Sequence, residues 1–367
     1  MVNAASLLNF GTTGLAVGDW LYSAYARTSP TYLPLNSYTT SYLVSSYPTL
    51  AAIVSPVVTP VAYAATARTL PSSQPWRPVA YGNGVFVALA TGPTTAAASS
   101  TDGITWTART IASGDWQSVT FGNGIFVAVT VGSNLAATSP DGITWTSRTL
   151  PSSSAWTCVA YGNGVFVAVA QSGTAAASSP DGITWTARTL PTVTNWISVA
   201  YGNGVFVAVS GNSLVFAVSY DGITWINGGN MVASTNASIT FGNGRFVCIC
   251  YSSNVASYSY NGFNWTSSTL PSSTGWQSIA YGNNSFVAVA YGSTAAATSP
   301  DGITWTARTL PSSSNWYSVA FGASKFVTVS NTTGTTAATI DYAVTATTFV
   351  LPVVPARFGT TAYVKAT

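Results

Sequence analysis

Short runs of alternating apolar and polar residues recur along most of the chain and are separated by turn sequences. In residues 156–190, WTCVAY and VFVAVA flank Gly162-Asn163-Gly164, while TAAASS and ITWTART flank Pro180-Asp181-Gly182. Alternation with a period of two is typical of strands, and Asn-Gly between such runs favours a tight hairpin. Pro presets φ and Gly accepts positive φ, so Pro-Asp-Gly predicts a second turn. The segment is therefore predicted to form four short antiparallel strands.

This four-strand unit repeats along the chain. An aromatic residue followed by Gly, a short turn and Phe-Val recurs every 40 residues, at Tyr81, Phe121, Tyr161, Tyr201, Phe241, Tyr281 and Phe321. A second motif keeps nearly the same step, at Asp102, Asp141, Asp181, Asp221, Asn261, Asp301 and Asp341. No segment has a useful helical period. Seven copies of a four-stranded unit of this length predict an all-β fold, a seven-bladed β-propeller.

The repeats also predict the domain organisation. Residues 1–61 lie outside them as an irregular N-terminal segment, residues 62–343 form the propeller, and residues 344–367 form a C-terminal tail. TARTLPSS at 66–73 matches the fourth strand of a unit but precedes the first complete unit. We therefore expect residues 64–70 to supply the outer strand of the blade made by residues 316–341. The alternative is that residues 344–350 complete that blade.

Tryptophan and aspartate recur at fixed places in the unit, which favours structural roles for both. One Trp opens the first strand of most units, and another follows the Asp-Gly turn. Such regular aromatics suit wedges between neighbouring sheets, although a row of sugar-stacking platforms is an alternative. We expect the Asp side chains to bond backbone amides in the turns. Turn or wedge roles are thus assigned to Asp102, Asp141, Asp181, Asp221, Asp301, Trp106, Trp145, Trp185, Trp225 and Trp305.

Composition argues against several functional classes. Charged residues make up 5% of the chain, and the net charge of +3 is scattered, so no binding to nucleic acid is expected. Residues 44–65 are apolar but interrupted by prolines, so we expect no membrane insertion, and the N-terminus lacks signal-peptide features. Cys158, Cys248 and Cys250 are expected to be small buried side chains.

Candidates for catalysis are few. The chain has no His and no Glu, and its eight acidic residues are all Asp. Six of these, including Asp341, follow the repeat and are expected in turns, whereas Asp19 and Asp115 are far apart in the sequence. Five of the nine arginines also follow the repeat and spread around the ring, with their charged heads expected in solvent: Arg68, Arg109, Arg148, Arg188 and Arg308. We expect a protein that is not an enzyme and holds no cofactor or metal.

Two resemblances add to this interpretation. SPDGITW resembles the Asp-box, or BNR repeat, of sialidases and related propellers, and the whole YGNGVFVAV…SPDGITWT unit resembles repeats of bacteriophage tail and other virion proteins. Residues 18–24 and 32–54 resemble a diverged phage tail-collar segment, in which Tyr47-Pro48-Thr49-Leu50 keeps the family's run and Asn36-Ser37 replaces its Asp-Gly. Sialidase catalysis, as the first resemblance implies it, needs a Tyr–Glu pair, which a chain without Glu cannot supply.

The resemblances imply a non-enzymatic structural protein on the exterior of a phage particle, a tail-associated, fibre-like adhesin. Residues 1–61 would attach it to other virion proteins. The loops between second and third strands vary from copy to copy, so their face is the candidate surface for a host glycan. Two alternatives are a capsid decoration or baseplate protein that packs against neighbours, and a sialidase-like glycoside hydrolase.

One junction departs from the repeat. After Trp225 the chain reads INGGNMVASTNASIT in place of TARTLPSSS, so Arg is lost and Asn236 stands where the next strand should open with Trp. The candidate ligand or partner residues are therefore Asn227, Asn230, Asn236 and Tyr251. Relaxed drift of a single repeat is the alternative explanation.

Overall fold

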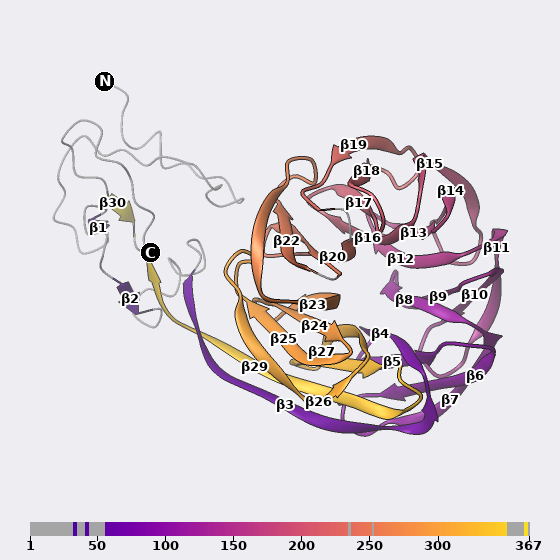
Figure 1. Cartoon of the computed structure of the whole chain (residues 1–367), viewed down its shortest axis with the longest axis horizontal. Coiled ribbons are helices and arrows are strands. Elements are labelled where there is room, and N and C mark those ends of the chain that lie inside the picture. The colour runs from indigo at the N-terminus through magenta and orange to yellow at the C-terminus, as the bar shows by residue number, and fades with distance from the viewer. Residues whose placement is uncertain are drawn as a thin grey trace. The chain divides into compact units, whose positions relative to one another are not determined.

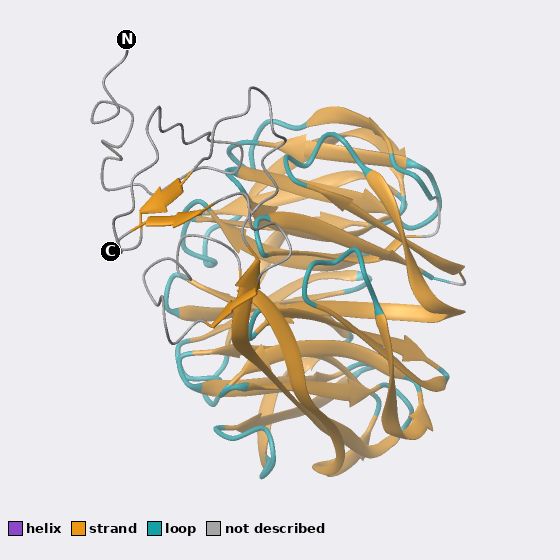
Figure 2. Ribbon diagram, turned by 90° about the vertical axis from the view of Figure 1, so that its left-hand side faces the viewer, coloured by secondary structure: helices purple, strands orange, loops and turns teal. Residues whose placement is uncertain are grey.

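The computed structural model describes residues 32–34, 41–43, 56–233, 236–251, 253–350 and 363–365, where every regular element is a β-strand (Figure 2). The chain divides into two compact units, residues 1–61 with 343–367, and residues 62–342. In the first unit, β1 (Tyr32–Pro34) pairs with β30 (Tyr363–Lys365). There, β2 (Ser41–Leu43) pairs with the end of β29 (Gly334–Val350). The C-terminal segment thus groups with the N-terminal one rather than standing alone.

The second unit consists of repeated antiparallel sheets arranged around a common axis (Figure 1). Within each four-stranded sheet the strands follow chain order, and the first strand is innermost. The first four-stranded sheet contains β4 (Trp76–Gly82), β5 (Val85–Ala90), β6 (Thr94–Ser100) and β7 (Thr107–Gly114), and the second contains β8 (Trp116–Gly122), β9 (Ile125–Thr130), β10 (Ser133–Ser139) and β11 (Thr146–Ser154). The third contains β12 (Trp156–Gly162), β13 (Val165–Ala170), β14 (Gly173–Ser179) and β15 (Thr186–Thr194). The fourth contains β16 (Trp196–Gly202), β17 (Val205–Ser210), β18 (Val215–Ser219) and β19 (Ile226–Asn230).

The remaining sheets are larger because some strands are continuous. One sheet contains β20 (Asn236–Gly242), β21 (Arg245–Cys250), β22 (Ser253–Ser259), β23 (Thr266–Gly282), β24 (Ser285–Tyr291), β25 (Ser293–Ser299) and β26 (Thr306–Ser314). Its long strand β23 ends one four-strand set and begins the next. The last sheet contains β27 (Trp316–Gly322), β28 (Lys325–Ser330) and β29, with β3 (Pro56–Gln74) and β2 both paired to β29. The predictions of an all-β fold and of repeated four-stranded propeller blades are confirmed.

The turn between the first two strands of each blade explains the recurring Asn-Gly. Asn83 and Gly84 have φ of 49° and 78°. Two successive residues at positive φ form the type I′ turn, whose twist matches that of the flanking strands. In the last blade, Ala323 and Ser324 adopt the same conformation, with φ of 44° and 62°, although neither is Asn or Gly.

The second turn is organised by the aspartate side chain. Asp141 Oδ1 accepts hydrogen bonds from the amides of Ile143 and Thr144, both at 2.8 Å, and from Ser139 Oγ at 3.0 Å. The amide oxygen of Asn261 takes the same bonds, so the turn does not require a charge. The same arrangement occurs at Asp102, Asp181, Asp221 and Asp301. The expectation of such a turn at Asp341 is wrong, because β29 runs through that position.

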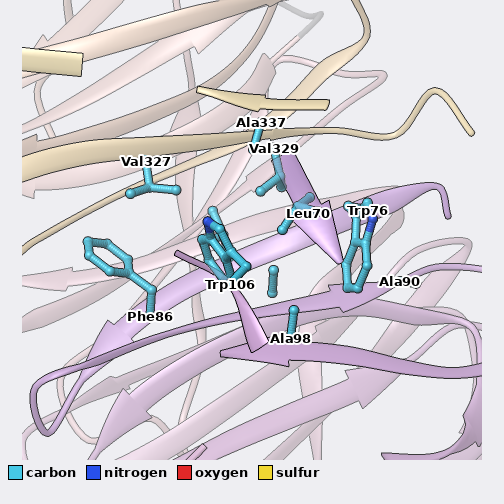
Figure 3. Close-up of a cluster of buried hydrophobic side chains, with 11 residues drawn as sticks. Leu70, Trp76, Phe86, Ala90, Ala98, Trp106, Val327, Val329 and Ala337 are labelled. Atoms are coloured by element: carbon cyan, nitrogen blue, oxygen red, sulfur yellow. The ribbon is translucent and has the colours of Figure 1, made fainter. Parts of the chain in front are cut away.

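The buried clusters lie between neighbouring blades. Figure 3 shows the cluster in which Val329 and Ala337 of the last blade meet Leu70 and Trp76. Trp76 is fully buried, and its Nε1 donates to Ser72 O at 3.1 Å. Every Trp that opens a first strand makes this bond to the carbonyl four residues earlier. The Trp residues that follow the Asp-Gly turns belong to the same inter-blade clusters but are slightly more exposed.

The beginning and end of the repeat region share a sheet. β3 pairs with β29, and Arg68 Nε donates to Thr339 Oγ1 at 3.0 Å. Arg109 makes the equivalent bond to Ser99 Oγ, at 2.9 Å, inside the first blade. The repeated arginines are therefore bonded to the neighbouring strand rather than simply solvated. Residues 344–350 continue β29 instead of forming a fourth strand for the last blade.

The three cysteines are free thiols. Cys248 and Cys250 are buried in β21, and Cys158 in β12 is half-buried. Burial raises the pKa of the Cys250 thiol to about 11. The description of these residues as small interior side chains therefore fits their places in the fold.

Candidate functional site: the central cavity

A cavity of about 430 Å³ lies where the innermost strands meet. Each innermost segment contributes to the wall the residue at its second position, counted from the site where six of the seven copies have Trp. These wall residues are Arg77, Gln117, Thr157, Ile197, Ala237, Gln277 and Tyr317. Loop residues from one face complete the wall: Asp115, Val131, Gln171, Gly211 and Tyr251.

A β-bulge places these side chains in the cavity wall. In β12, Trp156 pairs with Ala170 and Cys158 pairs with Val169, so Thr157 is an extra residue on the inner strand. The same shift occurs at the corresponding place in every innermost strand. Bulges re-aim a side chain while the flanking ladder stays paired. The position can therefore accept different residues without loss of the blade's hydrogen bonds.

Backbone hydrogen bonds fix the loop residues of the wall. Val131 N donates to Asp115 O at 3.0 Å, and Gln171 N donates to Ala155 O at 3.0 Å. Gly211 N is bound in the same way to Asn195 O, at 2.9 Å. The residue before the opening Trp thus anchors the loop that follows the second strand. The cavity is consequently a preformed site on the face that carries the varied loops.

The charged residues of the wall are Arg77 and Asp115. The Arg77 guanidinium lies over the Tyr317 ring, 4.1 Å from its centroid, and Arg77 Nη2 donates to the Tyr317 hydroxyl. Cation–π stacking holds the guanidinium in one orientation. Arg77 also stabilises the charged form of Asp115. The wall therefore carries one positive and one negative side chain.

Asp115 is held by three donors. Gly92 N and Gln117 Nε2 each donate to Oδ1 at 3.0 Å, and the Thr91 hydroxyl donates to the same oxygen. Burial raises the pKa of this carboxyl group, but the bonds from Gly92, Thr91 and Gln117 outweigh burial and bring the pKa below its usual range. Asp115 is therefore a carboxylate at neutral pH.

The candidate residues from the irregular junction do not form one pocket. Asn227 and Asn230 lie on β19, the outermost strand of its sheet, because this segment pairs along β18. Asn227 Oδ1 accepts the amide of Gly229 at 2.9 Å, which serves a local turn. Asn236 opens β20, where its backbone pairs with Cys250, and its side chain lies outside the described residues. Of the four, Tyr251 alone lines the cavity.

Sequence reasoning missed the bulge residues and Asp115. A usable signal was present, because the copies read WRPVAYG, WQSVTFG, WTCVAYG, WISVAYG, NASITFG, WQSIAYG and WYSVAFG. The residue after the opening position takes six different identities in seven copies, while its neighbours change little. Diversity at one position of a near-identical repeat marks a site that packing does not constrain.

Metal clusters, membrane spans and the turn aspartates were the remaining candidate features in the part of the chain that the structure describes. That part contains no group of three or more His, Cys, Asp or Glu side chains that could hold a metal ion. No helix there is long and apolar enough to cross a membrane. The aspartates of the second turns bond their own turn amides, on the face away from the varied loops.

Comparisons with known proteins identify the fold. Residues 109–238 match a family model described as the DUF6242 beta propeller domain. No curated protein matches the chain. The family match covers about a third of the sequence, so it shows similarity to that domain in the central repeats.

Solved structures agree on the β-propeller. Virginiamycin B lyase from Staphylococcus aureus has a TM-score of 0.69 at 10% identity, covering 76% of this chain and 99% of the lyase. YCF48 from Cyanidioschyzon merolae has a TM-score of 0.59 at 16% identity, covering 75% and 98%. The WD40 domain of Toxoplasma gondii coronin has a TM-score of 0.57 at 9% identity, covering 80% and 89%. At these identities the likeness concerns architecture alone.

Proposed function

We propose that the protein is a non-enzymatic structural component of a bacteriophage virion, a tail-associated adhesin whose propeller binds a host surface glycan in the central cavity. Residues 1–61 attach it to other virion proteins, on the exterior of the particle. The resemblance of the N-terminal segment to a phage tail-collar region supports the location, and its residues are largely outside those that the structure describes. The resemblance of the repeats to virion proteins supports it independently.

The observation that carries the binding role is the concentration of diversity in the cavity wall. Turn and wedge positions are nearly constant among the repeats, whereas the second position of the innermost strands is not. Packing leaves this inward position unconstrained, so its residues can change without cost to the blade. Different wall residues would then meet different parts of an asymmetric ligand, as a binding site requires.

The proposal includes seven blades of Asp-box type. β23 serves two four-strand sets, so the seven-stranded sheet counts as two blades, and β3 completes the blade begun by β27. The innermost strands contact one another in a closed circuit from β4 through β8, β12, β16, β20, β23 and β27. Ser-x-Asp-Gly turns between the third and fourth strands support the Asp-box resemblance.

The absence of catalysis is supported by the composition of the wall. Asp115 is its one acidic residue, and no His or Glu exists anywhere in the chain. A glycoside hydrolase normally needs two carboxyl groups that flank the scissile bond. A sialidase-like reaction is therefore disfavoured, and turnover of a fluorogenic sialoside by the purified chain would contradict this part of the proposal.

A second candidate function is a capsid decoration or baseplate protein that packs against neighbours. It is favoured by the propeller face that carries the Asp-Gly turns, opposite the varied loops. The residue after the Asp-Gly turn is an isoleucine with 39–44% of its surface exposed at Ile104, Ile143, Ile183 and Ile223. A repeated apolar residue on one face suits protein contacts.

Location in the particle and infection assays separate the two roles. Antibodies against residues 62–342 should label the tail of intact particles in electron micrographs, and few copies per particle should be found. Purified protein should reduce infection by competing for the host surface. Labelling over the whole capsid, with no effect of added protein on infection, would instead establish the decoration role.

A further inference from the structure

The cavity wall has a polar side and an apolar side. Polar residues come from consecutive inner strands, namely Gln277, Tyr317, Arg77, Gln117 and Thr157 on β23, β27, β4, β8 and β12. Ile197 and Ala237, on β16 and β20, complete the circuit. A ligand that fills the cavity therefore meets hydrogen-bonding groups on one side and apolar surface on the other.

The carboxylate of Asp115 presents an available acceptor. All the hydrogen bonds that described residues donate to it end on Oδ1, from Thr91, Gly92 and Gln117. Oδ2 receives none of them. A charged oxygen to which no described residue donates is suited to accept a hydrogen bond from a ligand hydroxyl group, and the three bonds to Oδ1 fix its orientation.

Side-chain amides on the same side supply complementary groups. Gln117 commits Nε2 to Asp115 and Thr91, which leaves its Oε1 as an acceptor. The side chains of Gln171 and Gln277 line the cavity without a hydrogen bond to another described residue. An amide carries both a donor and an acceptor, and a sugar hydroxyl needs both kinds of partner.

The apolar side contains an aromatic surface. Tyr251 is 39% exposed and contacts Tyr291 edge-on, with ring centroids 6.4 Å apart. Its ring also lies close to Gly275, and Tyr251 lines the cavity together with Ala237 and Ile197. The C–H face of a pyranose ring is apolar and suits such a surface.

Charge selects among hydroxyl-rich ligands. Arg77 is stacked on Tyr317, and Arg77 and Asp115 give the wall one charge of each sign. The available oxygen of Asp115 repels an anionic group. Anionic sugars such as sialic and uronic acids are therefore disfavoured.

We infer that the central cavity binds a neutral, hydroxyl-rich sugar residue, with its hydroxyl groups on Asp115, Gln117 and Gln277 and its apolar face toward Ile197, Ala237 and Tyr251. This inference rests on the proposed role of the cavity as the ligand site. The volume of about 430 Å³ falls in the range of about 300–1,000 Å³ that is usual for small-ligand sites.

Saturation-transfer NMR on the intact chain tests the inference with four classes of probe: neutral methyl hexosides, methyl N-acetylhexosaminides, a methyl glucuronide and glucosamine. At least one neutral or N-acetylated glycoside should receive saturation, and the glucuronide should not. Asp115→Asn should weaken the binding of that glycoside at least about tenfold, because a hydrogen bond to a charged acceptor is lost.

Asp301→Asn is the matched control. It removes the same charge from a second turn, and Asn261 already makes the bonds of that turn without a charge. Its thermal midpoint and its sugar binding should equal those of the unmodified protein. Asp115→Asn should keep the thermal midpoint within a few degrees, so that weakened binding reports on the cavity.

Three results would overturn the inference: binding of the glucuronide or glucosamine alone, binding of no probe, or equal binding by the Asp115→Asn variant. If the protein still blocked infection in any of these cases, the adhesin role would stand and the cavity assignment would fall. Sugar binding lost in Asp115→Asn, in a protein that is missing from phage particles, would support the cavity assignment and remove the virion role.

Discussion

Gly322 lies against the ring of Tyr81, so the last repeat joins the first by the contact that joins all other neighbours. A Cβ on Gly322 would overlap the Tyr81 ring, just as a Cβ on Gly122 would overlap Tyr161. Val79 N also donates to Ser318 Oγ at 3.3 Å across this junction, as Val159 N does to Ser118 Oγ at 3.1 Å elsewhere. The ring is therefore closed by the same contacts that join every other pair of neighbouring repeats.

Replacement of Gly322 by Ala should open or strain this junction. The methyl group has no room beside Tyr81, and overpacking of an ordered interior costs about 1–3 kcal/mol or more. We expect the free energy of unfolding, measured in urea, to fall by about 3 kcal/mol. Gly173→Ala is the control, since the nearest atom to its Cβ is 4.0 Å away. Equal effects of the two changes would contradict the role of Gly322 in closure.

The turn at Ala323 and Ser324 should be a site of stabilisation. Both residues have positive φ, which costs an ordinary L-residue about 1–2 kcal/mol, and the other turns mostly use Asn-Gly there. The double change Ala323→Asn with Ser324→Gly should raise the thermal midpoint by several degrees. The reverse change in another blade, Asn163→Ala with Gly164→Ser, should lower it. An unchanged midpoint in both variants would show that the turn conformation carries no cost.

The two classes of Trp should differ in their response to Phe. Trp156 is 1% exposed, and its Nε1 donates to Ser152 O at 3.1 Å. Trp145 Nε1 is buried and has no hydrogen-bond partner among the described residues. Because Trp156→Phe leaves a gap and breaks a bond, it should destabilise by about 2–3 kcal/mol, and Trp145→Phe by about 1 kcal/mol or less. Denaturation midpoints of the two variants would test this order, and its reversal would count against it.

The turn aspartates should make stability depend on acid pH. Hydrogen bonds from backbone amides, chiefly those of Thr105 at Asp102 and Thr144 at Asp141, lower the pKa of these carboxyl groups. A pKa that is lower in the folded chain contributes stability above the unfolded pKa, and this stability is lost as the pH falls through the folded pKa. The unfolding midpoint should therefore be flat near neutral pH and decline below about pH 4.

A variant isolates this contribution. Replacement of Asp by Asn at positions 102, 141, 181 and 221 should keep the turns, because Asn261 already forms one. It should also reduce the decline of the unfolding midpoint at acid pH. Asp181 and Asp221 have the same lowered pKa from the amides of Thr184 and Thr224. If the variant declined as steeply as the unmodified chain, other carboxyl groups, such as Asp115, would control the acid response.

Much of the fold could be predicted because its signals are local. Asn163-Gly164 and Pro180-Asp181-Gly182 predict the two turns, and the alternation in VFVAVA predicts the strand. The period of 40 residues then supplies the architecture. Asp341 keeps the 40-residue step but forms no turn, because the Gly and Trp that follow the other aspartates are missing there.

The cavity was harder to predict because its wall depends on register and on the closed ring. Thr157 lines the cavity through a bulge, and alternation along WTCVAY does not reveal which residue is extra. Asn227 and Asn230 were unusual in sequence but lie on an outermost strand, away from the axis. Unusual residues therefore mislead when the position of their strand in the blade is not considered.

A glycan array probed with the labelled intact chain tests the central claim, that the varied cavity wall binds a host glycan. The unmodified protein and the Asp301→Asn control should bind the same small set of glycans, with a neutral sugar at the recognised position. The double variant Asp115→Asn with Gln277→Ala should lose them while keeping its thermal midpoint. Retention of the same glycans by the double variant, or binding of none by the unmodified chain, would contradict the account.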